Sequence, residues 1–284
     1  MDTPAIPSFN GSRLVRLLSA FIPADIEAPG RYFADRFGNL VGLAGSMSLS
    51  KVHAELSATG LKPDVTATSA GAAKMITEAF LRARRSLVRA IAMSFIPMAG
   101  NPKDRLPTPE RLHAHFQLTG VFAVKRPGNP QTHATAFEPY RQFYTARQRE
   151  LEMKVRQLRS HIGAEISGIS PQSAQLSTLD ASLGEVLLPR TQELFAVIPK
   201  LLERRFGGGL DAHRRTLSKA PAASDLAQWI EPDGWIGLFC NDMRALLLAE
   251  LEVRLQPVSG MIESLSETSA ADHLLDQEKG PDCD

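Results

Sequence analysis

Residues 234–265 read GWIGLFCNDMRALLLAELEVRLQPVSGMIESL and form the most apolar long stretch of the chain. Between residues 238 and 255, twelve positions are apolar and six are polar. At about 100° per residue, the polar positions are spread around the helix instead of gathering on one side. A helix of this kind is contacted on several sides, so the stretch predicts a protein built from packed helices. Pro257 is expected to end or kink this helix, because proline lacks an N–H group.

One row of apolar side chains on this helix repeats every four residues. Two uses are open for such a row: it packs in the core of a helical bundle, or it contacts a partner or a second copy of the chain. Core packing is the commoner use. The row is the candidate partner contact of the sequence and consists of Phe239, Met243, Leu247, Leu251 and Leu255.

Residues 137–169 predict a long amphipathic helix. Pro139 is expected in its first turn, where proline is tolerated. Eight heptad-type positions alternate between steps of four and three residues, and six of the eight are apolar, which indicates coiled-coil-like packing. These positions are Tyr144, Gln148, Leu151, Val155, Leu158, Ile162, Glu165 and Ile169.

A return helix is expected to begin at Ser170 and Pro171, as N-cap and first helical residue. Because the connection before it is short, the two helices should lie antiparallel. Pro189 and Pro199 interrupt the apolar pattern, so the segment is either one kinked helix or a series of shorter helices. The run Gly207–Gly209 is expected to end it. Together with 234–265, these segments predict a three-helix unit.

The predicted fold class is therefore all-α, with N-terminal short helices and a C-terminal bundle of long antiparallel helices. In the N-terminal part, helices are expected near 14–21, 29–41, 49–56 and 72–95. The expected parts are a helical region over 12–96, a proline-rich basic linker without regular structure over 97–136, the long-helix bundle over 137–265, and a disordered acidic tail over 266–284.

Charge is distributed unevenly along the chain, although the formal net charge is only +1. Residues 74–159 hold 16 Lys and Arg against 6 Asp and Glu, whereas residues 225–284 hold 3 against 13. The two blocks either neutralise each other within the fold or serve different partners. The candidate anion contacts lie close together on one predicted helix of the basic block. They are Arg82, Arg84, Arg85 and Arg89. Nucleic acid is the alternative partner that such cations suggest.

The chain contains no motif for catalysis, cofactor binding or metal binding. With only two cysteines, no disulfide framework or four-ligand zinc site can form, and burial in an apolar helix should raise the pKa of Cys240. His113 and His115 form the only close histidine pair, and Glu110 is the only nearby carboxylate, so solvated histidines are expected instead of a metal site. No nucleophile elbow, Walker loop or dinucleotide fingerprint is present. We therefore expect a non-enzymatic protein.

No stretch approaches the roughly 20 apolar residues that a membrane-spanning helix needs. Near the N-terminus the apolar run is short and contains Pro23, which is unlike a secretory signal. A soluble, cytoplasmic protein is therefore the expectation.

Four runs of the chain resemble a proteobacterial family known only as domain of unknown function 3348. The most specific is LLAELEVRLQPV at 247–258, whereas 97–135 matches the family least. The resemblance implies an uncharacterised bacterial helical protein and supplies no catalytic residues. It also implies a setting, because such proteins are associated with genes for a proton-channel-like inner-membrane protein and a peptidoglycan-binding outer-membrane-protein-A-like protein. The runs cover 12–50, 137–162, 197–210 and 242–265.

Residues and resemblance together predict an interaction or scaffold protein that has a protein partner or associates with itself. An accessory role beside a cell-envelope complex follows from the resemblance alone. A nucleic-acid-associated protein that binds through the basic block 74–159 is the alternative.

Overall fold

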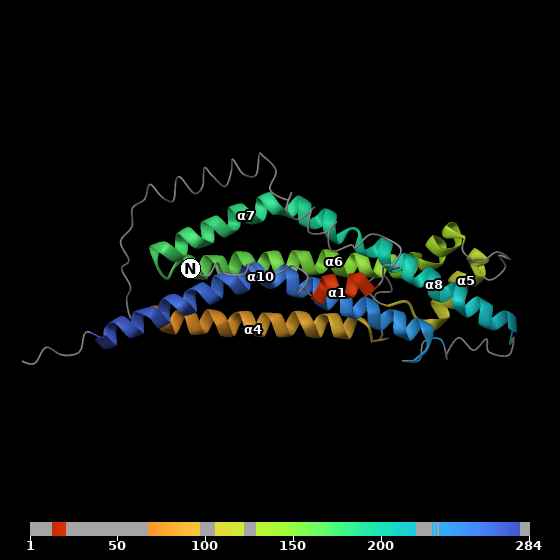
Figure 1. Ribbon diagram of the computed structural model, residues 1–284, viewed down its shortest axis with the longest axis horizontal. Helices are drawn as coiled ribbons and strands as arrows, with labels where there is room; N and C mark the ends of the chain where they lie inside the picture. Colours follow the sequence, from red (N-terminus) through yellow and green to blue (C-terminus); the bar gives the residue numbers. More distant parts are fainter. Residues whose placement is uncertain are drawn as a thin grey trace, which may run out of the picture. The chain divides into compact units, whose positions relative to one another are not determined.

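The computed structural model describes residues 13–20, 68–96, 106–121, 129–219, 229, 231 and 233–278. Within these ranges all regular structure is helical and no strand occurs, which confirms the all-α prediction. The helices expected over 29–41 and 49–56 lie outside the described residues. The helices of Figure 1 are α1 (Arg13–Ala20), α4 (Thr68–Ser94), α5 (Pro109–Thr119), α6 (Pro130–Ser167), α7 (Pro171–Phe195), α8 (Ile198–Lys219) and α10 (Trp235–Glu278).

The chain divides into two compact units, and several long helices contribute to both. Unit 1 comprises residues 1–37, 88–151 and 193–251, and unit 2 comprises residues 38–87, 152–192 and 252–284. Each unit is described by itself below.

Aromatic side chains from three helices form the centre of unit 1. Phe137 and Tyr140 come from α6, Phe206 from α8 and Phe239 from α10, and all four are buried. Their ring centroids lie between 5.2 and 6.5 Å apart, mostly in tilted or edge-on pairs. Such pairs stabilise a core beyond the area that they bury, so these rings hold the three helices together.

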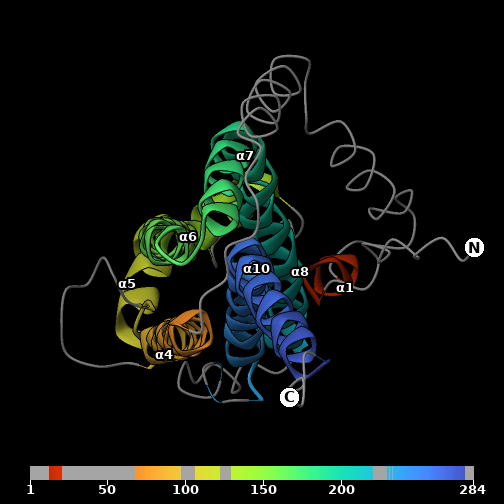
Figure 2. The same cartoon turned by 90° about the vertical axis from the view of Figure 1, so that its left-hand side faces the viewer.

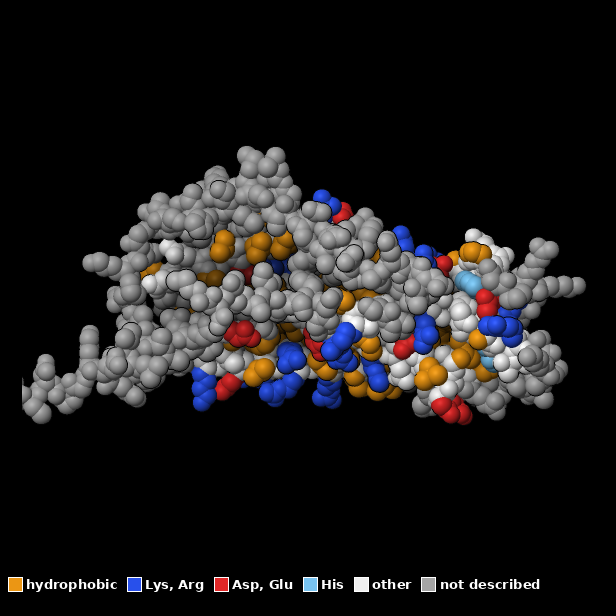
Figure 3. Space-filling view, in the orientation of Figure 1, with side chains coloured by type: hydrophobic (Ala, Val, Ile, Leu, Met, Phe, Trp, Pro, Cys, Tyr) orange, Lys and Arg blue, Asp and Glu red, His pale blue; other side chains and the backbone are white. Residues whose placement is uncertain are grey.

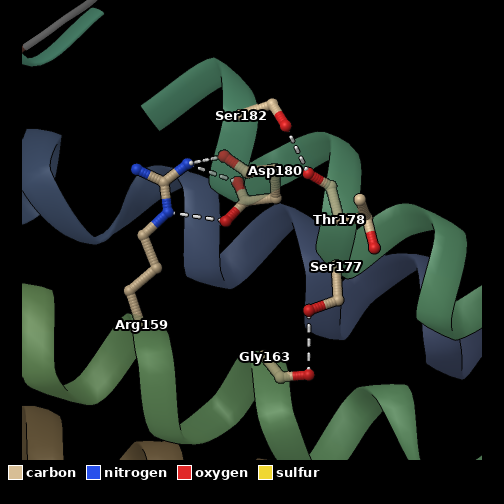
Figure 4. Close-up of polar contacts among 6 residues, drawn as sticks. All are labelled: Arg159, Gly163, Ser177, Thr178, Asp180 and Ser182. Atoms are coloured by element: carbon tan, nitrogen blue, oxygen red, sulfur yellow. Dashed lines mark hydrogen bonds and ion pairs between the residues drawn. The ribbon is translucent and has the colours of Figure 1, made fainter. Parts of the chain in front are cut away.

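In unit 2 the end of α6 packs against α7 as an antiparallel pair. Arg159 donates to both carboxylate oxygens of Asp180, at 2.6 Å each, and to its backbone carbonyl at 2.7 Å. One turn further along α6, the carbonyl of Gly163 accepts a hydrogen bond from Ser177 Oγ at 2.9 Å (Figure 4). Residue numbers rise along α6 while they fall along α7, which confirms the antiparallel prediction.

The predicted heptad row of α6 agrees only in part with its burial. Val155 and Ile162 are buried, but Glu165 is exposed and Ile166 is buried in its place. Coiled-coil packing therefore stays a prediction.

The return segment forms two helices, which decides between the two predicted alternatives. Ser170 Oγ accepts a hydrogen bond from the Ser173 N–H at 3.1 Å, so Ser170 caps α7 as expected. A turn at residues 196–197 separates α7 from α8. Pro189 lies inside α7, and Pro199 lies in the first turn of α8, where its missing N–H is tolerated.

The prediction that Gly207–Gly209 ends a helix is wrong, because α8 continues through all three glycines to Lys219. The reason is close packing. A Cβ on Gly207 would lie 2.5 Å from His133 Nδ1, and one on Gly209 would lie 3.1 Å from the Trp235 ring. Nothing lies within 4 Å of a Cβ on Gly208. Two of the three glycines therefore make room for side chains of α6 and α10.

The expectation of an unstructured linker over 97–136 is also wrong, since it contains α5 and the start of α6. Thr108 caps α5 by accepting from the Arg111 N–H at 3.4 Å, and Pro109 occupies the first turn. Gly120 ends the helix in the left-handed conformation, at φ 62°. Leu112 and Phe116 are fully buried, so α5 is part of the core of unit 1.

Helix α10 is longer than the sequence pattern suggested. Pro257 lies inside it, and the helix reaches Glu278 instead of ending near residue 265. The expected disordered tail over 266–284 is therefore helical as far as Glu278, and its last six residues lie outside the described part of the chain.

A histidine of α5 compensates for the proline inside α6. Pro139 has no N–H to donate to the carbonyl of Thr135, the acceptor four residues earlier in an α-helix. His115 Nε2 lies 2.7 Å from this carbonyl oxygen. Because a carbonyl only accepts, His115 must be the donor, so α5 supplies the hydrogen bond that Pro139 cannot make.

We expect His115→Ala to lower the free energy of unfolding by about 1–2 kcal/mol, because it leaves the part-buried Thr135 carbonyl without this donor. The cost should shrink in a Pro139→Ala background, where the helix itself provides an N–H. Urea denaturation of the four proteins of this double-mutant cycle measures the coupling. His113→Ala, on the exposed side of α5, is the control and should change stability by less than about 0.5 kcal/mol. Equal costs of His115→Ala in both backgrounds would contradict the assignment.

Candidate functional site

The candidate site is the exposed side of α4. Basic residues that the sequence predicted as anion contacts lie on this helix. Within unit 2, Ile76 and Phe80 are buried, whereas Lys74, Arg82 and Arg85 are exposed. At about 100° per residue, Arg82 and Arg85 fall on the side of the helix opposite these two apolar side chains. We call Lys74, Arg82 and Arg85 the basic face of α4. Arg84 in unit 2, and Arg89, which belongs to unit 1, are also exposed.

The cations of the basic face have little neutralisation from the described part of the chain. Arg82 lies 3.8 Å from Glu78, and both side chains are more than half exposed. A surface pair of this kind contributes between about 0 and 1 kcal/mol. Lys74, Arg84 and Arg85 make no ion pair with any described residue. Arg84 and Arg85 are both exposed.

Apolar side chains are exposed beside these cations. Met75 is 71% exposed and Leu81 is 37% exposed. Figure 3 shows Lys and Arg side chains, with hydrophobic side chains between them, along the edge that α4 forms. A face that combines cations with exposed apolar groups suits a protein partner better than a phosphate backbone alone.

The row that was the candidate partner contact is buried within the chain. Its side chains are at most 4% exposed, and Phe239 contacts the aromatic centre of unit 1. This burial is the arrangement expected of core packing, and it leaves the row off the exposed surface. The row consists of Phe239, Met243, Leu247 and Leu251 in unit 1 and Leu255 in unit 2.

The close histidine pair does not converge on one point. Both residues lie on α5, where His113 Nε2 is 2.6 Å from Gln117 Nε2 and His115 binds the Thr135 carbonyl. No group of three or more His, Cys, Asp or Glu side chains in the described ranges is placed to hold a metal ion.

A cluster of histidines and tryptophans in unit 1 was not predicted. His133 Nε2 of α6 lies 3.0 Å from Asp211 Oδ2 of α8, with both side chains less than one-fifth exposed. His213 stacks on Trp235 at 5.6 Å between ring centroids and meets Trp229 edge-on at 4.4 Å. The glycines of α8 were the available sequence signal, because they permit the close approach of His133 and Trp235.

Partial burial among these rings lowers the pKa of His213 from its ordinary value of 6.5. Between the lowered pKa and 6.5, the unfolded chain binds more protons than the folded chain, so stability should fall as pH decreases through about 6.5. We expect His213→Phe to reduce this loss while it retains the ring stack. Thermal denaturation from pH 7.5 to 5.5 measures the effect, with His161→Gln as an exposed control. Identical pH dependence in the wild type and His213→Phe would contradict the assignment.

A buried carboxylate joins α6 to α10 in unit 1. Glu250 is fully buried and accepts a hydrogen bond from Tyr144 Oη at 2.5 Å. Gln148 Nε2 lies 3.0 Å from each of its carboxylate oxygens and 3.1 Å from the carbonyl of Phe195. Gln148 therefore links α6 both to α10 and to the end of α7. These contacts are structural, since they lie inside the core.

The thiol and phenol near this core are poor nucleophiles. Burial raises the pKa of the Cys240 thiol to about 12. This confirms the expectation that burial in an apolar helix makes the thiol less reactive. Burial, together with the neighbouring Cys240, raises the pKa of Tyr140 well above its usual 10. Both groups are protonated at neutral pH, and neither is prepared for attack on a substrate.

The comparisons with known proteins identify a family but no function. The family model described as "Protein of unknown function (DUF3348)" matches residues 1–267. No curated protein and no solved structure matches the chain. Among the described helices, none combines the length and the apolar character needed to cross a bilayer.

Proposed function

The chain belongs to the DUF3348 family, and we propose that it is a non-enzymatic interaction protein that binds an acidic partner protein through the basic face of α4. The observation that carries this proposal is the set of exposed cations of the basic face, of which only Arg82 makes an ion pair within the described residues, to Glu78, and which lie beside exposed Met75 and Leu81. The cations supply attraction and the apolar groups supply buried area.

The buried positions of the other reactive groups support a binding role over a catalytic one. Cys240 and Tyr140 are protonated at neutral pH, and Glu250 accepts hydrogen bonds within the core. In this proposal the protein works in the cytoplasm. The family resemblance extends the proposal to an accessory role beside a cell-envelope complex, in which the partner is another protein of that complex.

Affinity purification of the tagged full-length chain from its native host, with partner identification, tests the proposal. We expect a partner that is recovered at low salt and lost both at high salt and with the double variant R82E/R85E. The matched control is K200E/R204E, which makes the same change of charge at two exposed positions of α8 and should retain the partner. Recovery of nothing, or equal recovery with R82E/R85E, would refute the proposed site.

Nucleic acid is the second candidate partner, because Arg84 and Arg85 present guanidinium groups that have no ion pair in the described part of the chain. Binding through them should weaken steeply between about 50 and 200 mM salt. A gel-shift assay with a DNA duplex and a single-stranded RNA at low salt tests this candidate. Absence of retardation at micromolar protein would remove it.

A further inference from the structure

Helix α7 is the least buried of the described helices of unit 2. The parts of α4, α6 and α10 in this unit each bury at least three apolar side chains, among them Phe80, Ile162 and Val258. In contrast, no side chain between residues 174 and 192, a stretch that the structure describes in full, is buried. Figures 1 and 2 both draw α7 above α6, on the side away from α4. Elements with few buried apolar contacts are the first to open in a folded chain.

Polar contacts join this stretch of α7 to α6 at intervals along its length. Near its start, Ser177 Oγ donates to the carbonyl of Gly163 at 2.9 Å. At its end, Gln192 Nε2 donates to Glu152 Oε1 at 2.6 Å, and this contact is exposed. Neutral hydrogen bonds and exposed contacts each stabilise a helix pair only modestly.

The strongest of these contacts is the pair of Arg159 with Asp180, which lies between the other two (Figure 4). It is charge-assisted and uses both carboxylate oxygens, and its side chains are only 25% and 12% exposed. Arg159 also donates to the Asp180 carbonyl, so it holds the backbone of α7 as well as the side chain. A Cβ on Gly184 would lie 2.7 Å from Arg159 Nη1, so this glycine gives the guanidinium room to lie against α7.

We propose that residues 174–192 of α7, which we call the strap, detach from α6 as a unit while the parts of α4, α6 and α10 in unit 2 stay packed. The Arg159–Asp180 pair is the latch that keeps the strap closed. In the open state the half-buried side chains of Leu176 and Leu183 become accessible. A ligand that binds only the open state would then shift unit 2 toward it. The strap is separate from the basic face of α4, so neither proposal depends on the other.

Hydrogen–deuterium exchange of the purified full-length chain, read by mass spectrometry of peptic peptides, tests the proposal. In the wild type, amides of the strap should exchange at least about tenfold faster than those of residues 255–265 of α10. Low concentrations of urea should accelerate exchange in the strap less than in 255–265, because opening the strap exposes less surface than unfolding the whole unit.

Substitutions in the pair test the latch. Arg159→Ala should accelerate exchange in the strap by a further factor of at least about ten, because it removes charge-assisted hydrogen bonds. Asp180→Asn, which keeps the size of the side chain and removes only its charge, should change the rate in the same direction. The matched control is Arg149→Ala, at an exposed arginine earlier on α6, and it should leave the strap unchanged. Circular dichroism confirms that each variant is folded.

Two results would overturn the inference. If the strap and residues 255–265 exchange at similar rates with the same dependence on urea, α7 opens only when the whole unit unfolds. If Arg159→Ala and Asp180→Asn leave exchange in the strap at the rate of the Arg149→Ala control, the pair is not a latch.

Discussion

Replacing Gly207 by alanine is expected to lower the free energy of unfolding by about 2–4 kcal/mol. The new Cβ would lie 2.5 Å from Nδ1 and 2.7 Å from Cγ of the His133 ring. The ring cannot turn aside cheaply, because its Nε2 lies 3.0 Å from Asp211 Oδ2. Either α6 and α8 separate or the His133–Asp211 pair breaks. Urea denaturation followed by circular dichroism measures the loss as a lower midpoint.

The neighbouring glycine provides the matched control. A Cβ on Gly208 meets nothing within 4 Å, and alanine is favoured over glycine in a helix interior by about 1 kcal/mol. Gly208→Ala should therefore leave stability unchanged or raise it by up to about 1 kcal/mol. The two substitutions are chemically identical and differ by one position. If they changed the midpoint by the same amount, the packing explanation of this glycine run would be wrong.

The second large effect is expected at Glu250. Glu250→Ala should lower the free energy of unfolding by about 3–5 kcal/mol, because it removes the acceptor for both Tyr144 and Gln148 inside the core. Tyr144→Phe, which removes one donor, should cost about 1–3 kcal/mol. Urea denaturation measures both variants.

Glu185 supplies the control for this prediction. It is an exposed glutamate of α7 without an ion pair to any described residue. Glu185→Ala should change the free energy of unfolding by less than about 0.5 kcal/mol. A loss at Glu250 no larger than the loss at Glu185 would show that the buried hydrogen bonds contribute nothing to stability.

The parts of the fold that follow from local periodicity could be predicted from the sequence. The Ser170–Pro171 start, the short connection before it and the heptad row of α6 were sufficient for the antiparallel pair of α6 and α7. In α10, the excess of apolar residues predicted burial on several sides, and the row from Phe239 to Leu255 is buried. In each case the physical cause, the local spacing of apolar residues, lies within a few residues of its effect.

The predictions of the linker and of the helix end at the glycines of α8 were wrong, because proline and glycine can each have more than one structural role. The many prolines of 97–136 suggested a linker, yet Pro109 and Pro130 begin helices. Their neighbours show this role. Thr108 caps α5, and Asn129 Oδ1 accepts a hydrogen bond from the Gln131 N–H at 3.0 Å. The glycines of α8 suggested a helix end, but their purpose is set by side chains far away in sequence.

The candidate site was predicted only in part. The arginines of α4 were predicted as a cluster of charge on one helix, but the sequence analysis did not separate Arg82 and Arg85 from Arg84 and Arg89 by the side of the helix on which they lie. The exposure of Met75 and Leu81 beside them could not be predicted, because it depends on which side of α4 packs against the chain. The buried role of Glu250 was equally hidden, since nothing in an apolar helix distinguishes an inward carboxylate from an outward one.

Both tryptophans of the chain, Trp229 and Trp235, belong to unit 1 and lie within 6.4 Å of each other beside His213. Intrinsic tryptophan fluorescence therefore reports on unit 1 alone, whereas far-ultraviolet circular dichroism reports on the helices of both units. Coincident melting curves would mean that the two units unfold as one cooperative block. A dichroism transition that precedes the fluorescence change would mean that unit 2 opens first, without any label having been attached to the protein.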